Sequence, residues 1–584
     1  MIWRRRALSA AAGILLALFL AAPGIALAHA HVIRSDPAAD LILPSSPRLI
    51  HLWTDEDLNG SLSRIVVWDR YRHVVTVGDA HLVPGQARQF EVGLKPLAPG
   101  SYLVLWTTVS AEDGHVLRGY YSFSVKEQGP LPSLVGVSAG GAGQGFPDTT
   151  TLAALLAHWI ELLAAVSWAG IAAFSALVFP VAAARLDGTL RQAEYRRVRT
   201  LVWLSLALLV AASVVVLLTQ AYSVTGDWGA ALAPTTFKDI FAEQYGEGWI
   251  GRLVVVIVAL VLSLRISVRS AAEQSPSEGA AVLTITGFVY LYAFAASGHA
   301  ASAHIGVLPG THSDLFSVSI FLDWLHFLAD ALWLGGQIYI VLVLMPMLDL
   351  RRKPCHHSIF LQTLNRFSPF AYASIASYVV TGGFSGKVHI PSWYAFFHSV
   401  YGWALVVKMS LIGLMMLTSA YTVYFLRPRL RRALEADGIR LMKRLLAWLR
   451  VNPVLGGGVL LVTSVMFYYP VPPGLAPAGP SSYLASSGGL TARVVLTPDH
   501  AGPNRITVSL RDRRGKPVTQ GSVTVISTML DMVMGSNLTP LTQTAPGTYT
   551  GTTDLGMGGR WGLELLAYQP SGLTRLRIDV QVGT

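Results

Sequence analysis

Long apolar runs fill the middle of the chain, and short alternating runs occupy its two ends. A helix of about 20 predominantly apolar residues crosses a bilayer, and eight segments near that length follow one another here. They are about 150–184, 200–224, 249–268, 280–298, 321–347, 366–386, 396–426 and 452–470. The pattern predicts a membrane domain, residues 150–470, built as a bundle of eight transmembrane helices.

The segments on either side of the membrane domain have the pattern of small β-domains. Both contain runs rich in β-branched and aromatic residues, with Asn, Gly and Pro at the turns between them. The runs include 64–68, 102–106 and 120–125 within residues 29–126, and 492–496, 505–510 and 576–580 within residues 471–584. We predict an all-β sandwich on each side, and residues 127–149, rich in Gly, Pro and Ser, as a linker.

The first 28 residues have the pattern of a secretory signal peptide. A basic stretch at 4–6 precedes an apolar core at 7–20, and Ala26-Leu27-Ala28 fits a small-x-small cleavage site. Cleavage after Ala28 is the expected processing. Cleavage after Ala30 and an uncleaved anchor helix are the alternatives.

Basic residues are concentrated in alternate loops of the predicted bundle. Cytoplasmic loops of membrane proteins carry an excess of Lys and Arg. The loops after the first, third, fifth and seventh apolar segments contain Arg185, Arg191, Arg196, Arg197, Arg199, Arg265, Arg269, Arg351, Arg352, Lys353, Arg427, Arg429, Arg431, Arg432, Arg440, Lys443, Arg444 and Arg450. Both β-domains are then extracytoplasmic, which agrees with a signal peptide and predicts a multi-pass protein of the inner or plasma membrane.

Composition supports this interpretation. Hydrophobic residues make up 52% of the chain and charged residues 13%, and the mean hydropathy is +0.48. The net charge of +11 is explained by the basic loops, so a nucleic-acid partner is not expected. The single cysteine, Cys355, excludes an intrachain disulfide and argues against a Cys-based zinc or iron–sulfur site.

A candidate metal site lies in the first β-domain. Cleavage after Ala28 would make His29 the first residue, whose amine and imidazole could bind one ion. Asp113 and His115 are two residues apart, and such side chains face the same way on an extended strand. This nitrogen-rich, tetragonal set suits Cu(II). His31 leaves an alternative open, because an amine with His at position three can wrap Cu(II) or Ni(II) using two deprotonated amides.

Three stretches of the first β-domain carry a family resemblance: HAHVIRSDPA at 29–38, LAPGSY at 97–102 and VSAEDGH at 109–115. They resemble the CopC family of periplasmic copper-binding proteins. The resemblance implies an Ig-like sandwich in which His29, Asp113 and His115 bind Cu(II) as a brace. Residues 29–126 contain no Met, so the Met-rich Cu(I) site of some family members is not expected.

Ionisable residues inside membrane spans are costly and suggest function. Those at or below the predicted outer surface are His158, Glu161, His299, His304, Asp323, His326 and Asp330, and Arg252 and Lys408 lie within the third and seventh segments. Asp323, His326 and Asp330 follow an i, i+3, i+7 spacing, which places them on one helix face. A cation captured outside would meet these side chains first, so they are candidates for a transport path.

Four motifs in the membrane domain carry a second resemblance. They are GWIGRL at 248–253, SGHA at 297–300, DWLHFLADALWLGG at 323–336 and YGWALVVK at 401–408. In this order they resemble the CopD family of copper-transport membrane proteins, which implies copper uptake across the inner membrane. The chain has no phosphate-binding loop motif, so transport would rely on a gradient or on cytoplasmic chelation.

Two further groups of soft or nitrogen ligands are weaker candidates. Cys355, His356 and His357 are placed in a cytoplasmic loop, where they could receive Cu(I) or be accidental neighbours. The C-terminal domain resembles FixH- or YtkA-type domains, and its Met529, Met532, Met534 and Met557 could bind Cu(I) or simply pack in a core.

These observations predict a non-enzymatic copper protein. Cu(II) is captured outside, copper is carried inward, and a periplasmic or cytoplasmic copper chaperone is a possible partner. Extracytoplasmic sequestration is one rival function. The other is a membrane redox protein that uses a copper brace or a haem bound by intramembrane histidines.

Overall fold

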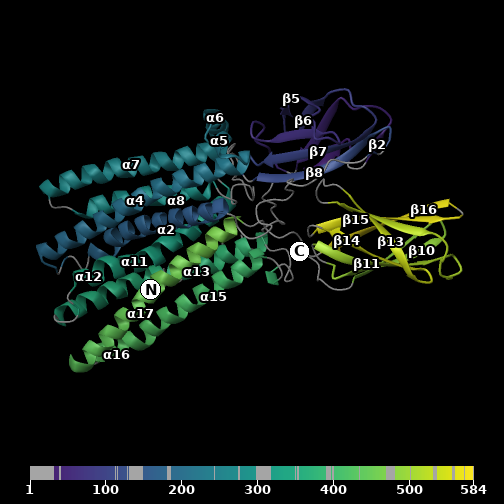
Figure 1. The fold of residues 1–584 in the computed structure, drawn as a ribbon. Helices are drawn as coiled ribbons and strands as arrows, with labels where there is room; N and C mark the ends of the chain where they lie inside the picture. The colour runs from purple at the N-terminus through teal and green to yellow at the C-terminus, as the bar shows by residue number, and fades with distance from the viewer. Residues whose placement is uncertain are drawn as a thin grey trace. The chain divides into compact units, whose positions relative to one another are not determined.

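A computed structural model describes most of the β-domains and of the helical bundle. The described residues are 32–38, 41–54, 56–111, 114, 116–127, 129, 149–180, 184, 186–242, 244–273, 276–297, 317–348, 350, 354–389, 396–397, 400–432, 435–468, 481–499, 502–530, 536–555, 559–570 and 572–582. The helices and the strands belong to two separate compact units (Figure 1).

The first β-domain is a sandwich of two four-stranded sheets. Its strands are β1 (Val32–Asp36), β2 (Ile42–Leu43), β3 (Leu49–Thr54), β4 (Arg64–Trp68), β5 (Thr76–Val83), β6 (Gln86–Leu94), β7 (Gly100–Val109) and β8 (Val116–Val125). The sheet orders are β1-β3-β6-β5 and β2-β8-β7-β4. Alternate residues point inward, so Ile50 and Leu52 of β3 pack in one core with Tyr121 and Phe123 of β8. The predicted all-β fold is confirmed.

The C-terminal domain is one eight-stranded antiparallel sheet. Its strands are β9 (Ser481–Ser487), β10 (Leu490–Thr497), β11 (Gly502–Arg511), β12 (Ser522–Met529), β13 (Asn537–Ala545), β14 (Thr548–Leu555), β15 (Gly559–Gln569) and β16 (Gly572–Val582). They lie in the order β16-β15-β12-β13-β14-β11-β10-β9. The edge strands β9 and β16 contact each other, so the sheet closes around a core that includes Trp561 and Tyr549.

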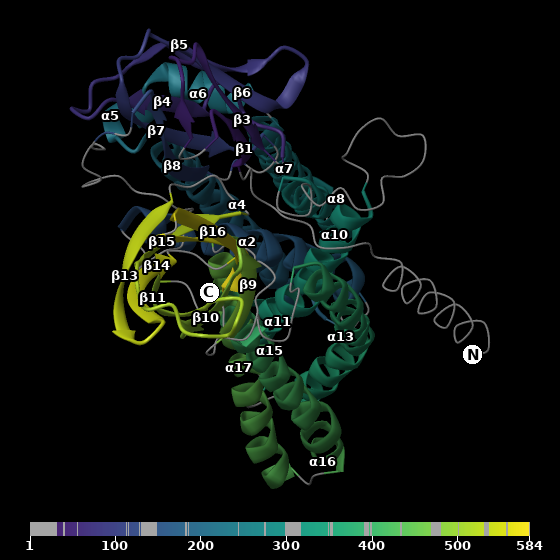
Figure 2. The same cartoon turned by 90° about the vertical axis from the view of Figure 1, so that its right-hand side faces the viewer.

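The helical unit contains a helix for every predicted apolar segment. Its elements are α2 (Thr149–Leu177), α4 (Gly188–Thr225), α5 (Trp228–Ala231), α6 (Pro234–Phe241), α7 (Gln244–Glu273), α8 (Pro276–Ala295), α10 (Val318–Asp330), η2 (Ala331–Gly335), α11 (Gly336–Tyr339), η3 (Ile340–Leu344), α12 (Met345–Met347), α13 (Pro354–His389), α15 (Val400–Ala420), η4 (Tyr421–Leu426), α16 (Arg427–Arg432) and α17 (Glu435–Tyr468). In both ribbon views the long helices lie side by side (Figures 1 and 2).

Among the described residues, six helical stretches are long and apolar enough to cross a membrane. They are Thr149–Leu177, Gly188–Thr225, Tyr245–Arg265, Val318–Met347, Tyr401–Arg432 and Gly438–Phe467, and Gly279–Ala295 is a shorter apolar helix. The remaining predicted segment, 366–386, lies within α13, which contains Pro369. The helices thus form a bundle of the predicted kind.

Helix α2 lies at the centre of this bundle. It contacts α4, α8, η2 and α17, and Val166, Trp168 and Ala169 are fully buried. A helix that is apolar on all sides is buried on all sides, which explains this central place. At Gly170 the backbone of α2 comes so close to η2 that an added Cβ would overlap the Ala331 carbonyl oxygen and lie 2.5 Å from the Gly335 Cα.

We expect Gly170→Ala to destabilise the bundle, because its methyl group has no space between α2 and η2. Overpacking of this kind usually costs about 1–3 kcal/mol and sometimes more. The matched control is Gly413→Ala in α15, where an added Cβ would meet no atom within 4 Å. Thermal unfolding of both variants in detergent measures the difference, and equal melting temperatures would contradict the close packing.

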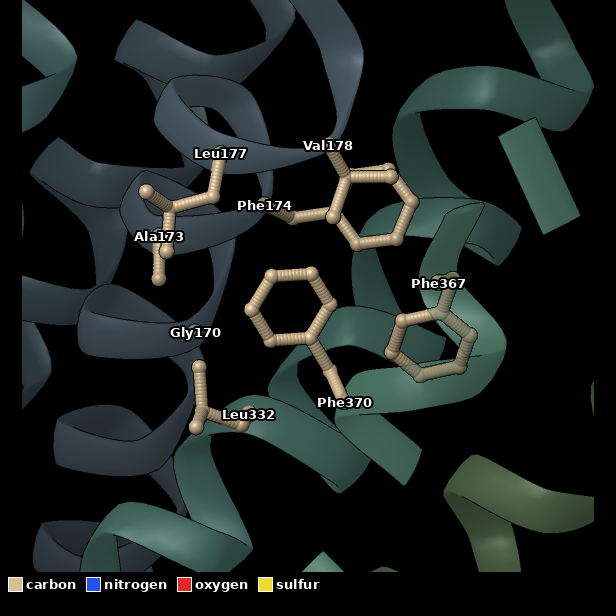
Figure 3. A pocket seen from close by; sticks show the side chains of 8 residues that line it. All are labelled: Gly170, Ala173, Phe174, Leu177, Val178, Leu332, Phe367 and Phe370. Atoms are coloured by element: carbon tan, nitrogen blue, oxygen red, sulfur yellow. The ribbon is translucent and has the colours of Figure 1, made fainter. Parts of the chain in front are cut away.

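A small pocket on the bundle is apolar throughout. It is lined by Gly170, Ala173, Phe174, Leu177, Val178, Leu332, Phe367 and Phe370. Figure 3 shows the aromatic rings of Phe174, Phe367 and Phe370 gathered beside α2. The side chains of this lining offer no ligand for an ion.

Candidate functional site

Several predicted ligands lie outside the described residues. They are His29, His31, Asp113, His115, His299, His304, Met532, Met534 and Met557, together with the side chain of Cys355. The residues that flank the predicted copper ligands in the sequence, Val32 and Ala111 among them, are described.

The segment 54–57 connects the start of β1 with the β7–β8 hairpin. Val32, the first residue of β1, pairs with Thr54 of β3, and the Thr54 hydroxyl donates to the Glu56 carbonyl over 2.7 Å. The Ala111 amide donates to the Asp57 carbonyl over 3.0 Å. The chain that follows His29 and the hairpin that carries Asp113 therefore border the same segment.

Glu56 is a buried carboxylate at this end of the domain, and the sequence analysis did not single it out. It is 7% exposed, and its Oε2 accepts a hydrogen bond from the Ser110 hydroxyl at 3.3 Å. The sequence feature that could have drawn attention to Glu56 is the run of three acidic residues at 55–57. Glu56 thus lies beside Ser110, at the start of the hairpin that carries Asp113.

The i, i+3, i+7 residues of α10 contact the neighbouring helix α13. His326 Nδ1 lies 2.7 Å from the Thr381 hydroxyl oxygen, and that hydroxyl donates its proton to the Ser377 carbonyl at 2.8 Å. His326 Nδ1 must therefore be the donor to Thr381. In the neutral ring this leaves the lone pair on Nε2, the tautomer that permits metal binding there.

Asp330 is held by the same helix. Tyr378 of α13 donates its hydroxyl to Asp330 Oδ1 over 2.7 Å, and the Tyr378 ring lies 5.0 Å from the His326 ring. Asp330 is buried, with 8% exposed. Thr381 and Tyr378 were missed by the sequence analysis, because hydroxyl residues are common in apolar helices and spacing alone does not reveal partners on another helix.

Asp323 on α10 and Lys408 on α15 are two further ionisable residues of the bundle. Lys408 on α15 interacts electrostatically with Asp330 and Asp323 and with His326. Within the described part of the chain, neither Asp323 nor Lys408 has an ion pair within 4.0 Å or a hydrogen bond. We call Asp323, His326, Asp330 and Lys408 the α10 polar layer.

The α10 polar layer is not a preformed metal centre. Among the residues that the structure describes, no three His, Cys, Asp or Glu side chains come close enough together to hold one metal ion. The layer therefore has the ligand types for a passing cation without a closed coordination sphere.

Glu161 lies in a second polar cluster, which connects four helices. Its Oε1 accepts from Tyr290 of α8 at 2.9 Å, from Arg252 of α7 at 3.3 Å and from Ser213 of α4 at 3.3 Å. His158 Nδ1 lies 3.5 Å from Oε2. One fully buried carboxylate is thus contacted by a cation and two hydroxyls in the observed state.

The placement of residues 355–357 in a loop is wrong. α13 begins at Pro354, because proline favours the first position of a helix, so these residues form its first turn. His357 Nε2 lies 2.7 Å from the Leu350 carbonyl oxygen, and His356 is buried. Successive helical residues point in different directions, so the two imidazoles do not face one ion.

Met529 is a core residue of the C-terminal domain. It lies at the end of β12, opposite Trp561 of β15, and is 6% exposed within the apolar core. The described part of the chain therefore supports the packing interpretation for this methionine.

Comparison with protein families gives matches along most of the chain. Residues 32–126 match the CopC domain, and residues 149–308 match the copper resistance protein D-like N-terminal domain. Residues 361–466 match copper resistance protein D, and residues 485–565 match a YtkA-like domain.

Individual relatives match different shares of the chain. The copper transport protein CutJ of Bacillus subtilis (strain 168) is 26% identical over 510 residues, which cover 86% of each chain. Protein YobA of Escherichia coli (strain K12) is 33% identical over 100 residues, which cover 17% of this chain and 80% of YobA.

Two solved structures match the first β-domain. CopC from Methylosinus trichosporium OB3b is 27% identical, with a TM-score of 0.16 and coverage of 18% of this chain and 100% of that one. PcoC, a methionine-rich copper resistance protein from Escherichia coli, is 28% identical, with a TM-score of 0.15 and coverage of 17% and 99%.

The matched families include those of copper resistance proteins, and the bundle of apolar helices agrees with a multi-pass membrane protein. The chain belongs to the CopC and CopD copper-resistance families, which it joins in one polypeptide with a YtkA-like C-terminal domain.

Proposed function

We propose that this protein captures Cu(II) outside the cytoplasm and carries copper inward across the membrane. The observation that carries the proposal is the union, in one chain, of a CopC domain with a CopD-type bundle whose helix α10 contains Asp323, His326 and Asp330.

Capture takes place at His29, Asp113 and His115. The connection of β1 and the β7–β8 hairpin through segment 54–57 supports this set, because it brings their flanking residues to one end of the domain. The buried Glu56 carboxylate adds favourable charge there. His31 competes as part of the alternative amine–amide wrap.

Both β-domains lie outside the cytoplasm in this proposal. The basic loops of the bundle, exemplified by the exposed Arg196 and Arg197 of α4, support this orientation through the positive-inside rule. Copper then passes from the first domain to the outer half of the bundle, where His158 and the α10 polar layer lie. A copper chaperone or chelator in the cytoplasm would keep the free ion low and make the flow inward.

Loss of the gene should lower cytoplasmic copper, and the wild-type gene should restore it. We expect His326→Ala to fail in this complementation, because it removes the one imidazole of the α10 polar layer. The control is His73→Ala in the first domain, an exposed histidine whose ring contacts Asp69, which should restore copper fully. Cytoplasmic copper is measured by mass spectrometry, with membrane levels of each variant checked by immunoblot.

The two rival functions give different results. Under sequestration, cytoplasmic copper stays unchanged or rises when the gene is lost. A haem-dependent redox function predicts a Soret band in the purified protein, and its presence would assign the intramembrane histidines to haem in place of copper.

A further inference from the structure

We propose that Arg427 forms a binding site for the phosphate of an anionic phospholipid, at the basic end of the helical stretch that runs through α15, η4 and α16. None of the residues of this site belongs to the α10 polar layer or to the Glu161 cluster. The site is therefore separate from the candidate copper path, and it concerns how the bundle contacts its membrane.

Arg427 is a buried cation that lacks the kind of partner found elsewhere in the bundle. It is 8% exposed, and Arg252, the other arginine buried among the described residues, is 6% exposed. Arg252 pairs with Glu161 at 3.3 Å, whereas Arg427 has no carboxylate within 4.0 Å in the described part of the chain. A buried charge is costly unless it is paired, so the guanidinium of Arg427 favours an anion that these residues do not supply.

The guanidinium of Arg427 uses only one of its three nitrogens. Nη1 donates to the Ser368 hydroxyl over 2.9 Å and lies 3.5 Å from the Leu364 carbonyl oxygen, both on α13. Among the described residues no acceptor meets Nε or Nη2, and Nε is buried. Nε–H and one Nη2–H point along the same edge of this planar group, and such an edge binds carboxylate or phosphate with two parallel hydrogen bonds. The unused edge thus has the geometry for an anion with two oxygens.

A π-helical turn immediately before Arg427 sets the direction of its side chain. Pro428 has no amide proton for the carbonyl of Tyr424, and the Arg427 amide donates to the Thr422 carbonyl, five residues earlier, at the end of η4. A π-turn holds one more residue than an α-turn, so it changes the direction of the side chains that follow, and such turns are frequent at functional sites. Here the side chain of Arg427 is directed at α13.

The surroundings favour a lipid as the source of the phosphate. In the span Tyr401–Arg432 only 11% of the most apolar stretch is buried by the protein, so most of its surface faces the bilayer. Tyr424 and Phe425 are 65% and 52% exposed, and the guanidinium of Arg429 lies 5.9 Å from the centre of the Phe425 ring. Exposed aromatic rings and basic residues at the end of a span are typical of the lipid headgroup level, and basic sites between helices there bind anionic headgroups.

Arg431 supplies a second cation to the same site. It is exposed and follows Arg427 by four residues on α16, which places both on one face of the helix. Like charges at this spacing repel each other, and an anion close to both relieves the repulsion. A lipid with a net negative charge does so better than a zwitterionic lipid, whose choline group brings back a positive charge.

The test measures lipid binding to the delipidated full-length protein by native mass spectrometry. The probes are phosphatidylglycerol, phosphatidylcholine and glycerophosphoglycerol, which is the first headgroup without acyl chains. We expect wild type to bind phosphatidylglycerol with a dissociation constant at least about tenfold below that for phosphatidylcholine. Arg427→Gln should abolish this preference. The control Arg197→Gln, at an exposed position of α4, should keep it.

Two further variants keep the test valid if Arg427→Gln does not fold. Arg431→Gln leaves the buried side chain in place and should reduce the preference about fivefold. Arg427→Lys keeps the charge, loses the bidentate edge and should also reduce the preference.

Three results would overturn the proposal. The first is a wild type without any preference, as expected if a carboxylate of this chain already pairs with Arg427. The second is displacement of phosphatidylglycerol by an equal concentration of glycerophosphoglycerol, which would make a soluble phosphate the ligand. The third is a loss in Arg197→Gln equal to that in Arg431→Gln, which would indicate unspecific attraction to basic residues.

Discussion

Replacing Glu161 by alanine should lower the free energy of unfolding of the helical bundle by about 3–5 kcal/mol. Arg252 is 6% exposed and Glu161 is fully buried, so the variant leaves a guanidinium charge inside the bundle without its counter-charge. It also removes the acceptor for the hydroxyls of Tyr290 and Ser213. Chemical unfolding of the purified protein in detergent, followed by tryptophan fluorescence, measures the loss.

A matched control separates the charge effect from the loss of a buried carboxyl group. Glu194 of α4 is also buried, with 3% exposed, but its Oε1 accepts from two neutral hydroxyls, Tyr339 at 2.7 Å and Ser175 at 2.8 Å. Glu194→Ala leaves no unpaired charge in the bundle. It leaves two neutral hydroxyl donors without their acceptor, which should lower the free energy of unfolding by about 1–3 kcal/mol. Equal losses in the two variants would contradict the structural importance of the Glu161–Arg252 pair.

A double variant provides the complementary result. Glu161→Leu with Arg252→Met removes both charges, and well-packed apolar replacements of a buried pair are often neutral or stabilising. We expect stability to return toward that of wild type in the double variant. If stability instead fell further than in Glu161→Ala, the remaining polar groups around Tyr290 would have to account for the loss.

Hydropathy predicted the bundle well and the ends of its helices poorly. The second apolar segment was placed at 200–224, whereas α4 begins at Gly188, where Asp187 caps the helix by accepting from the Leu190 amide. The first turns of α4 contain Arg191 and Arg196 on exposed positions. Charged turns of this kind extend a helix beyond its apolar stretch, so an apolar window cannot detect them.

For the candidate site too, the sequence predicted which residues share one helix face but not which residues of a neighbouring helix contact them. The spacing of Asp323, His326 and Asp330 indicated one helix face, and α10 contains all three. Their partners Thr381 and Tyr378 lie on α13 and could not be derived from spacing, because the packing of two helices decides which hydroxyls meet. The π-helical turns η2 and η3, which shift the helical phase after Asp330, also have no sequence signal here.

Copper affinity of the first domain should fall at least about 100-fold in Asp113→Ala or His115→Ala. Loss of even an outer-sphere partner of a metal ligand costs about 10–100-fold, and these variants remove a proposed ligand itself. The measurement is competition for Cu(II) against a chelator, using full-length protein whose first residue is verified as His29 by mass spectrometry. The electron paramagnetic resonance spectrum should change together with the affinity.

The matched variant is His31→Ala, which separates the brace from the amine–amide wrap. In the brace, His31 is not a ligand, so His31→Ala should keep the wild-type spectrum while Asp113→Ala changes it. In the wrap the results are reversed, because His31 supplies an essential nitrogen and the hairpin supplies none. The frame around segment 54–57 favours the brace: Ala111, which precedes Asp113 in the hairpin, is hydrogen-bonded to Asp57, next to the buried Glu56 carboxylate.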